Sequence, residues 1–167
     1  MERYSDRIWT PSEADLLAEY KFIKSEVKEL GKDVIDALVS CSVSYRRRAY
    51  TPYSHYNVGA SLLTTDGQIF GGCNSESVAY SPTNHAEGSA IAAANSEGAS
   101  IPNRKFIRAV AVCAKGNSGP CGECLQRIVE HTDNCLIIVA DTEGEVVRIT
   151  SLKAIFPYNF NPSHLGK

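Results

Sequence analysis

Two buried-type strands, separated by a short helix in the second half of the chain, constrain the fold most strongly. The runs FIRAVAVCA (residues 106–114) and CLIIVAD (residues 135–141) are almost wholly apolar, which is typical of covered strands. Between them, LQRIVEH (residues 125–131) has the pattern of a short helix. Strands that alternate with helices indicate βαβ units, a partly parallel sheet and helices on its faces. The end of the chain predicts one more strand, GEVVRIT (residues 144–150), and a short helix that stops at Pro157.

The first half predicts two helices. Thr10-Pro11-Ser12-Glu13 has the pattern of a capping box with proline at the first helical position, so a helix should begin there. Gly31 is expected to end it, and a second helix should cover residues 33–47. The apolar residues that recur at helical spacing along the first helix are Leu16, Tyr20, Ile23, Val27 and Leu30.

A hairpin and a third helix are expected to follow. NVGASLLTTDGQIFGGCN (residues 57–74) predicts two strands joined by a tight turn at Asp66-Gly67, a dipeptide that readily adopts positive φ angles. The alanine-rich run from His85 to Ser96 has high helix propensity and stops before Gly98.

Composition excludes several classes of protein. With 167 residues, 43% of them hydrophobic and 22% charged, the chain can bury one core and lacks the signature of disorder. A net charge of -2 gives no electrostatic footprint for nucleic acid or an acidic membrane, and Arg46-Arg47-Arg48 is interpreted as a solvated helix end. No apolar run reaches the roughly 18–20 residues of a membrane span, and the first ten residues lack a signal-peptide core. We therefore expect a cytoplasmic location.

Cys121-x-x-Cys124 is the first element that indicates chemistry. Thiolates rather than thiols bind metals, and a helix N-terminus lowers a cysteine pKa, so a pair just before a helix suits metal binding. Taken alone, the pair favours one of three other interpretations over a catalytic zinc: two buried cysteines, a redox pair, or half of a four-cysteine zinc site.

His85-x-Glu87 opens another helix and adds what the cysteine pair lacks. One histidine and two cysteines make three protein ligands, the number that a catalytic zinc uses when its fourth position is kept for water. Glu87, two residues beyond the histidine, could reach that water without binding the metal. Each residue also has a plainer interpretation, His85 as a helix cap and Glu87 as a first-turn carboxylate favoured by the helix dipole. Their joint occurrence with Pro120-Cys121-x-x-Cys124 favours the catalytic one.

The combination H-x-E…P-C-x-x-C is the signature of zinc nucleobase deaminases, and the sequence resembles the cytidine deaminase family. The resemblance runs from about residue 33 to 165 and includes GPCGECLQ and the ending IFPYNF. It implies a three-layer α/β/α fold with a mixed five-stranded sheet and helices on both faces. It also implies an N-terminal helical extension, residues 1–32, before a catalytic domain at residues 33–167.

The resemblance also implies roles for individual residues. Zn²⁺ is expected on His85, Cys121 and Cys124, with Glu87 as the catalytic acid and base. The family's ribose-binding Asn-x-Glu corresponds to Asn74 and Glu76. Tyr56 is expected to line the nucleoside pocket, at a position where the family usually has Phe. The main chain of Ala86 and of Gly119 is expected beside the pyrimidine, and the family usually has Ser in place of Gly119. Phe160 would stack on the base from a neighbouring subunit.

A departure from the three-cysteine members of the family is consistent with these ligands. Those members commonly carry arginines that offset the charge of three thiolates, at the positions of Gly88 and Leu125. Here His85 replaces one thiolate, so the site carries one negative charge less and no arginine is required at position 88.

The implied function is hydrolytic deamination of cytidine or deoxycytidine in pyrimidine salvage, by a homotetramer or alternatively a homodimer. A deaminase of a modified nucleoside such as blasticidin S, a nucleic-acid deaminase and a non-enzymatic zinc or nucleoside binder are the competing hypotheses. The slightly acidic chain argues against a polyanionic substrate, and Glu87 argues against a purely structural zinc.

Overall fold

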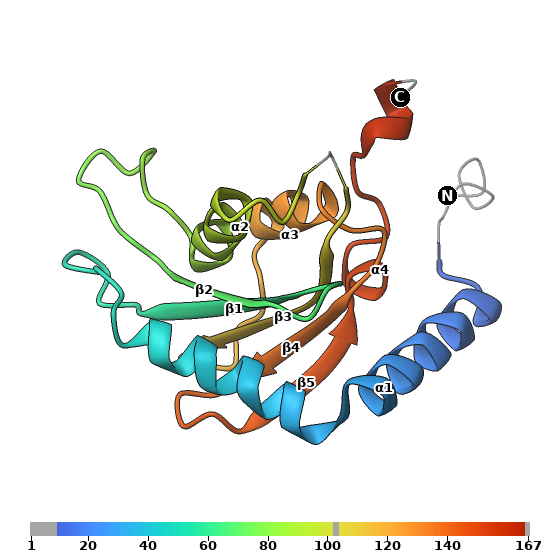
Figure 1. Cartoon of the computed structure of the whole chain (residues 1–167). Helices are drawn as coiled ribbons and strands as arrows, with labels where there is room; N and C mark the ends of the chain where they lie inside the picture. Colours follow the sequence, from blue (N-terminus) through green and yellow to red (C-terminus); the bar gives the residue numbers. More distant parts are fainter. Residues whose placement is uncertain (1–9, 102–103, 166–167) are drawn as a thin grey trace, which may run out of the picture.

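A mixed five-stranded sheet forms the centre of the molecule in the computed structural model, which describes residues 10–101 and 104–165 (Figure 1). The strand order is β2-β1-β3-β4-β5. Only β3 and β4 are parallel, and every other neighbouring pair is antiparallel. The strands are β1 Val58–Thr64, β2 Ile69–Cys73, β3 Ile107–Ala114, β4 Leu136–Ala140 and β5 Val146–Ser151.

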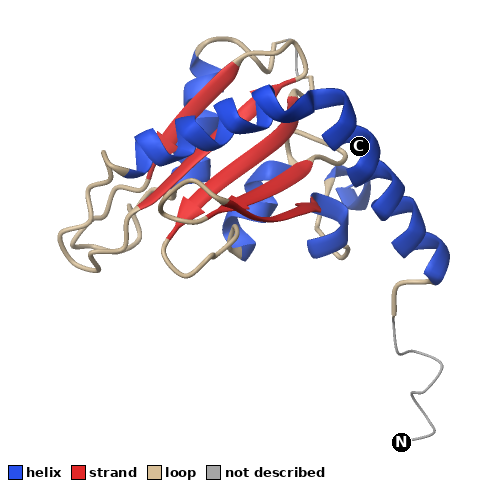
Figure 2. Cartoon of the chain, turned by 90° about the horizontal axis from the view of Figure 1, so that it is seen from below, coloured by secondary structure: helices blue, strands red, loops and turns tan. Residues whose placement is uncertain are grey.

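Helices cover both faces of the sheet, so the predicted three layers are confirmed. α1 crosses one face, and α2 and α3 lie side by side on the other (Figures 1 and 2). Each face has its own apolar core, one built with α1 and the other mainly with α2 and α3. The helices are α1 Glu13–Arg46, α2 Ala86–Ser96, α3 Gly122–Val129, α4 Leu152–Ile155 and a 3-10 helix at Pro162–Leu165.

The local signals for the hairpin and the parallel pair are also confirmed. β1 and β2 pair antiparallel across the predicted turn, where Gly67 has a φ of 88° and its N–H donates to the carbonyl of Thr64. The segment β3-α3-β4 forms the βαβ unit, because α3 carries the chain back along one face before β4 pairs parallel with β3. This crossover places the start of α3 beside the carboxyl end of β3.

α1 differs from the prediction at its start. The N-cap is Ser12, not Thr10, and the box closes with Asp15: Asp15 N–H donates to the Ser12 hydroxyl at 3.1 Å, and Ser12 N–H donates to the Asp15 carboxylate at 3.2 Å. The helix starts two residues later than predicted because Ser12 and Asp15 make both hydrogen bonds of a capping box. Gly31, with φ 72° and ψ 170°, breaks the helix as predicted, although the two halves remain continuous around the kink.

The part of α1 from Phe22 to Leu30 packs on the core, whereas Leu16 and Tyr20 nearer its start are exposed. Phe22, Ile23 and Val27 lie against the apolar cluster under β3 and β4. Arg108 of β3 donates to Glu26 at 3.0 Å and to Glu29 at 2.7 Å. This part is therefore tied to the sheet by both apolar contact and charge. Residues 1–9 of the predicted extension lie outside the described residues. No helix in the described ranges is long and apolar enough to cross a membrane.

Replacing Arg108 with Met should lower the free energy of unfolding by about 1–2 kcal/mol. This loss is larger than that for an exposed ion pair and smaller than that for a fully buried one. The reason is that Glu26, whose side chain is only 18% exposed, loses its partner. Urea denaturation measures the change. Arg104→Met is the matched control, because Arg104 and Asp66 are each more than 40% exposed and should contribute less. An equal loss in both variants would contradict the anchoring role of Arg108.

Candidate metal centre and active site

Two helix N-termini bring the predicted metal ligands together. His85 is the N-cap of α2, Cys121 is the N-cap of α3, and Cys124 lies in the first turn of α3. The predicted short helix thus begins at Gly122 instead of Leu125, which places the cysteine pair on its first turn. Neither N-cap side chain caps its own helix, so both are available for another partner.

The three donor atoms are spaced as a tetrahedral zinc requires. Nδ1 of His85 lies 3.2 Å from Sγ of Cys124 and 3.4 Å from Sγ of Cys121, and the two sulfurs are 3.6 Å apart. Zinc bonds of about 2.3 Å to sulfur and about 2.0 Å to nitrogen place the sulfurs about 3.8 Å apart and the nitrogen about 3.5 Å from each. Of the histidine, cysteine and acidic residues that the structure describes, only these three form such a group. The donors therefore fit zinc.

The electrostatics of the group also call for a cation. Burial, reinforced by the Glu87 carboxylate beside it, raises the pKa of the Cys124 thiol far above its ordinary value. Glu87 itself is only 5% exposed and has no positively charged partner among the described ion pairs. A bound cation removes this penalty because it pairs with the thiolate directly. The same buried carboxylate is placed to exchange protons with a ligand at the centre.

A cavity of about 410 Å³ opens beside the donor group and holds most of the predicted nucleoside contacts. This volume lies in the range of small-molecule sites. The lining residues predicted from sequence are Tyr56, Asn74, Glu76, His85, Ala86, Glu87, Gly119, Cys121 and Cys124. Ser54, Thr83 and Ser118 also line it, and no sequence signal pointed to them.

Asn74 and Glu76 are held rigidly by the loop that precedes β1. The amide of Asn74 accepts from Val58 N–H at 2.8 Å and donates to the carbonyl of Tyr56 at 2.9 Å. Glu76 accepts from the Ser54 hydroxyl and from the backbone N–H of Tyr53 and Ser54. These hydrogen bonds, that of the Ser54 hydroxyl first, lower the pKa of the Glu76 carboxyl, so it is ionised. Each side chain keeps hydrogen-bonding capacity for a further partner, since the amide of Asn74 has a second N–H and Oε1 of Glu76, which accepts only from the Ser54 hydroxyl, has a second lone pair.

The hydroxyl of Tyr56, which the family's usual phenylalanine lacks, makes a hydrogen bond within the protein. The hydroxyl donates to the carbonyl of Lys115 at 2.7 Å. Lys115 begins the loop that leads from β3 through Gly119 to Cys121. The hydroxyl therefore fastens the two walls of the cavity together, while the ring remains part of the lining.

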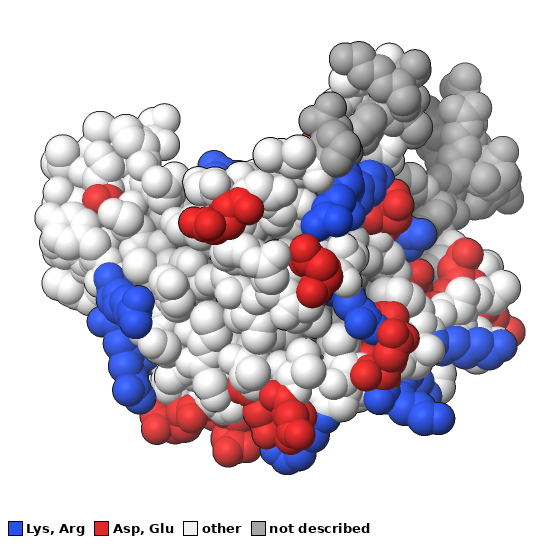
Figure 3. All heavy atoms as spheres, in the orientation of Figure 1, with Lys and Arg blue, Asp and Glu red and all other residues white. Residues whose placement is uncertain are grey.

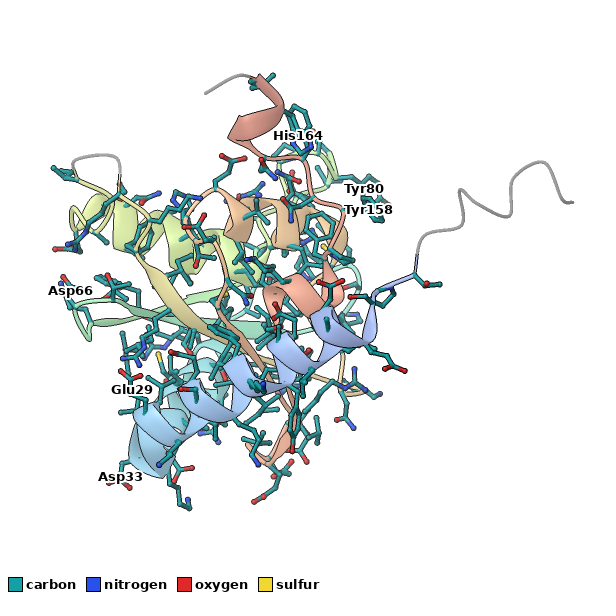
Figure 4. All side chains as sticks on the ribbon, turned by 90° about the vertical axis from the view of Figure 1, so that its right-hand side faces the viewer. Glu29, Asp33, Asp66, Tyr80, Tyr158 and His164 are labelled. Atoms are coloured by element: carbon teal, nitrogen blue, oxygen red, sulfur yellow. The ribbon has the colours of Figure 1, made fainter. Side chains whose placement is uncertain are left out.

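Phe160 lies apart from the cavity of its own chain. Its ring stacks on His164 with centroids 5.5 Å apart, and its side chain is 57% exposed. Its carbonyl accepts from Gln126 at 2.7 Å, which attaches the C-terminal segment to α3. Figure 4 shows His164 at the tip of this segment, away from the end of the molecule where Glu29 and Asp33 lie. Phe160 is thus the one predicted contact that the fold does not bring to the site.

Position 88 itself carries no arginine, but an arginine from another helix lies beside Gly88. The guanidinium of Arg127, from α3, occupies this space, because a Cβ on Gly88 would lie 2.5 Å from its Nη1. Arg127 is paired with Glu123 at 2.7 Å. Neither Glu123 nor Arg127 was predicted from the sequence, although their i,i+4 spacing just after Cys121 is typical of an ion pair on a helix. Leu125, the other position considered, is buried in the core instead.

A family model described as the cytidine and deoxycytidylate deaminase zinc-binding region matches residues 32–140. The chain belongs to this family. The matched range contains the donor group, Glu87 and most of the cavity lining. Membership confirms the predicted family, enzyme class and zinc cofactor.

Relatives and solved structures agree with this assignment. The cytidine deaminase of Sporosarcina psychrophila is 39% identical over 135 residues, which cover 79% of this chain and 95% of that relative. The crystal structure of cytidine deaminase from Burkholderia pseudomallei is 35% identical, with a TM-score of 0.67 over 74% of this chain and 97% of that one. The enzyme from Mycobacterium tuberculosis is 32% identical, with a TM-score of 0.63 over 75% of this chain and 96% of its own. The predicted fold class is confirmed.

Tyr56→Phe should loosen the loop from Lys115 to Cys121 without emptying the cavity wall. Loss of one hydrogen bond of this kind costs about 0.5–1.5 kcal/mol, so amide exchange in the loop should be faster by roughly threefold to tenfold. Hydrogen exchange followed by mass spectrometry measures it. Tyr80→Phe is the control, because Tyr80 is 82% exposed and does not line the cavity. Unchanged exchange in Tyr56→Phe would show that the hydroxyl does not fasten the loop.

Proposed function

We propose that this protein catalyses the hydrolytic deamination of cytidine and deoxycytidine to uridine and deoxyuridine, with release of ammonia. The observation that carries the proposal is the buried Glu87 carboxylate, which lies beside a histidine and two cysteines at the inner end of a cavity of nucleoside size. A structural zinc site has no need of a base at an open position, whereas a hydrolytic one does.

The proposed metal ligands are His85 through Nδ1 and the thiolates of Cys121 and Cys124. When bound, zinc would supply Lewis-acid activation of a water, whose pKa it lowers towards about 7. Three protein ligands would leave one position for water. Glu87 lines the same cavity as the three ligands.

Glu87 is the proposed proton carrier. It takes one proton from the attacking water and delivers it to N3 of the pyrimidine as the water oxygen bonds to C4. It then passes the second proton to the amino group, which leaves as ammonia when the C4–N bond breaks. The buried position of Glu87 favours these transfers because competing bulk water is excluded.

The remaining cavity residues hold the nucleoside in this proposal. Asn74 and Glu76 bind the ribose hydroxyl, the main chain of Ala86 and Gly119 contacts the pyrimidine, and the ring of Tyr56 forms an apolar wall. The internal hydrogen bonds of Asn74 and Glu76 support this role, because preorganised partners lose little entropy on binding.

The charge of the cavity favours an unphosphorylated substrate. None of the described residues that line it is Lys or Arg, and two are glutamates. Figure 3 shows that the lobe at the upper left, formed by the loops before β1 and α2, is almost free of charged side chains. A phosphate would therefore meet no Lys or Arg among the described lining residues. An intact ribose-binding pair also favours an ordinary nucleoside over blasticidin S, which lacks an ordinary ribose.

We further propose that the active form is a homotetramer in which Phe160 completes a neighbouring subunit's site, with a homodimer as the alternative. Support comes from the 57% exposure of Phe160 outside its own cavity and from the exposed aromatic residues Tyr50 and Tyr53, whose backbone N–H groups donate to the cavity residues Asn74 and Glu76. Residues 33–167 form the proposed catalytic domain and residues 1–32 the added helical segment. A role in pyrimidine salvage and a cytoplasmic location remain predictions.

Glu87→Gln should lower kcat by at least about 10²- to 10⁴-fold, the usual contribution of a positioned acid and base, while zinc content stays at the wild-type level. Ultraviolet monitoring of cytidine measures the rate, and elemental analysis measures the metal. Glu97→Gln is the matched control, because Glu97 caps the opposite end of the same helix and should leave kcat unchanged. Near-normal activity of Glu87→Gln would refute the assigned role.

Cytidine and deoxycytidine should be much better substrates than free cytosine, cytidine 5′-phosphate or blasticidin S. Ligands that leave polar groups of a binding site unpaired are disfavoured by up to on the order of 10⁴-fold, and a phosphate would face two glutamates and no Lys or Arg. The measurement is kcat/KM for the five compounds under one condition. Comparable values for cytosine and cytidine would remove the ribose role of Asn74 and Glu76.

A further inference from the structure

The outer surface of α3 carries an ion pair next to the metal centre. Nη2 of Arg127 donates to Oε1 of Glu123 at 2.7 Å, one helical turn apart, and both side chains are about half exposed. The glutamate precedes the arginine by four residues, the favourable order on a helix. An isolated pair of this kind would be an ordinary surface feature. This pair differs because Glu123 lies close to His85 and Arg127 lies against Gly88.

Glu123 faces the nitrogen of His85 that is turned away from the thiols. Nδ1 is the atom near both sulfurs, and Nε2 lies 3.8 Å from Oε2 of Glu123. If Nδ1 binds zinc, Nε2 must carry the ring proton. The separation is longer than a direct hydrogen bond, and one rotamer adjustment of the exposed glutamate or a single bridging water spans it.

Gly88 provides the space for this arrangement. It lies in the first turn of α2, and any Cβ there would come within 2.5 Å of Nη1 and 3.3 Å of Cζ of Arg127. The guanidinium therefore rests against the backbone of α2 while its other nitrogen holds Glu123. Glu123 is in this way fixed between α3, which carries it, and α2, which carries His85.

We propose that Glu123 is a positioning residue for His85 and that Arg127 holds Glu123 in place. The inference rests on the proposed function, since it requires that His85 bind zinc through Nδ1. Glu123 fixes the tautomer with the proton on Nε2 and aims Nδ1 at the metal. A carboxylate at this position also makes the imidazole a more basic ligand.

Arg127 keeps the charge of the centre balanced. Two thiolates neutralise the two positive charges of zinc, and a free carboxylate beside His85 would add one negative charge. Arg127 cancels that charge locally. The pair thus orients the histidine without altering the net charge near the reacting water.

Zinc affinity, measured on the full chain by competition with a chromophoric chelator, tests the proposal. Glu123→Gln should weaken zinc binding by about 10- to 100-fold, the usual effect of losing a partner of a metal-bound histidine. Glu130→Gln removes the same charge from the other end of α3 and should change the affinity by less than about threefold. Equal affinities in wild type and Glu123→Gln, or equal losses in both variants, would overturn the proposal.

A second measurement separates positioning from general destabilisation. In protein loaded with Co²⁺, the visible absorption bands report the geometry of the ligands, so Glu123→Gln should shift them and Glu130→Gln should not. The thermal unfolding midpoint of the metal-free protein should be nearly the same for both, because Glu123 is exposed. Unshifted bands in Glu123→Gln would contradict the role.

Gly88 and Arg127 provide an internal cross-check. Gly88→Ala should weaken zinc binding in the wild-type background, because the new Cβ displaces the guanidinium. In the Arg127→Met background the same change should have little further effect, so the two losses should not add. Additive losses would mean that Gly88 acts independently of Arg127. A wild-type chain that binds no zinc would refute the proposed function, whereas zinc-binding wild type with unaffected variants would refute this inference alone.

Discussion

The close approach of α2 to β2 is the contact on which the geometry of the site depends. A Cβ on Gly72 would lie 2.3 Å from the backbone nitrogen of Ala90 and 2.5 Å from the carbonyl oxygen of Ala86, so helix and strand backbones meet there directly. Small buried alanines on the same helix face allow this contact. Because a backbone contact leaves little freedom to slide, it fixes the height of α2 above the sheet and with it the position of His85 and Glu87.

The parallel crossover supplies the other half of the site. β3 and β4 must run in the same direction, so α3 must return along the face that α2 occupies. Its first turn then lies beside the carboxyl end of β3, next to the start of α2. Two helix N-termini meet at one place, and both direct unpaired backbone N–H groups towards it. A thiolate or a carboxylate is favoured in that environment.

The secondary structure was predictable because its signals are local. The Asp66-Gly67 turn, the break at Gly31 and the apolar strands β3 and β4 each follow from a few consecutive residues, and all are confirmed. The start of α1 was wrong by two residues, because two overlapping capping boxes compete and the sequence does not rank them. The donor group was predictable too, since His85, Cys121 and Cys124 match a spaced pattern whose chemistry is specific.

Most contacts between segments far apart in the chain could not be predicted from local sequence signals. The sequence by itself determined the elements, because these depend on residue type and short spacing. It also indicated His85, Glu87, Cys121 and Cys124 as a set, because a specific motif links these residues although His85 and Cys121 are 36 positions apart. Only the tertiary structure decided that the hydroxyl of Tyr56 fastens the loop at Lys115, that Phe160 lies outside its own cavity, and that Arg127 fills the space over Gly88. The physical reason is that such contacts depend on how two helices and a loop pack on a twisted sheet, and no spacing along the chain records that packing.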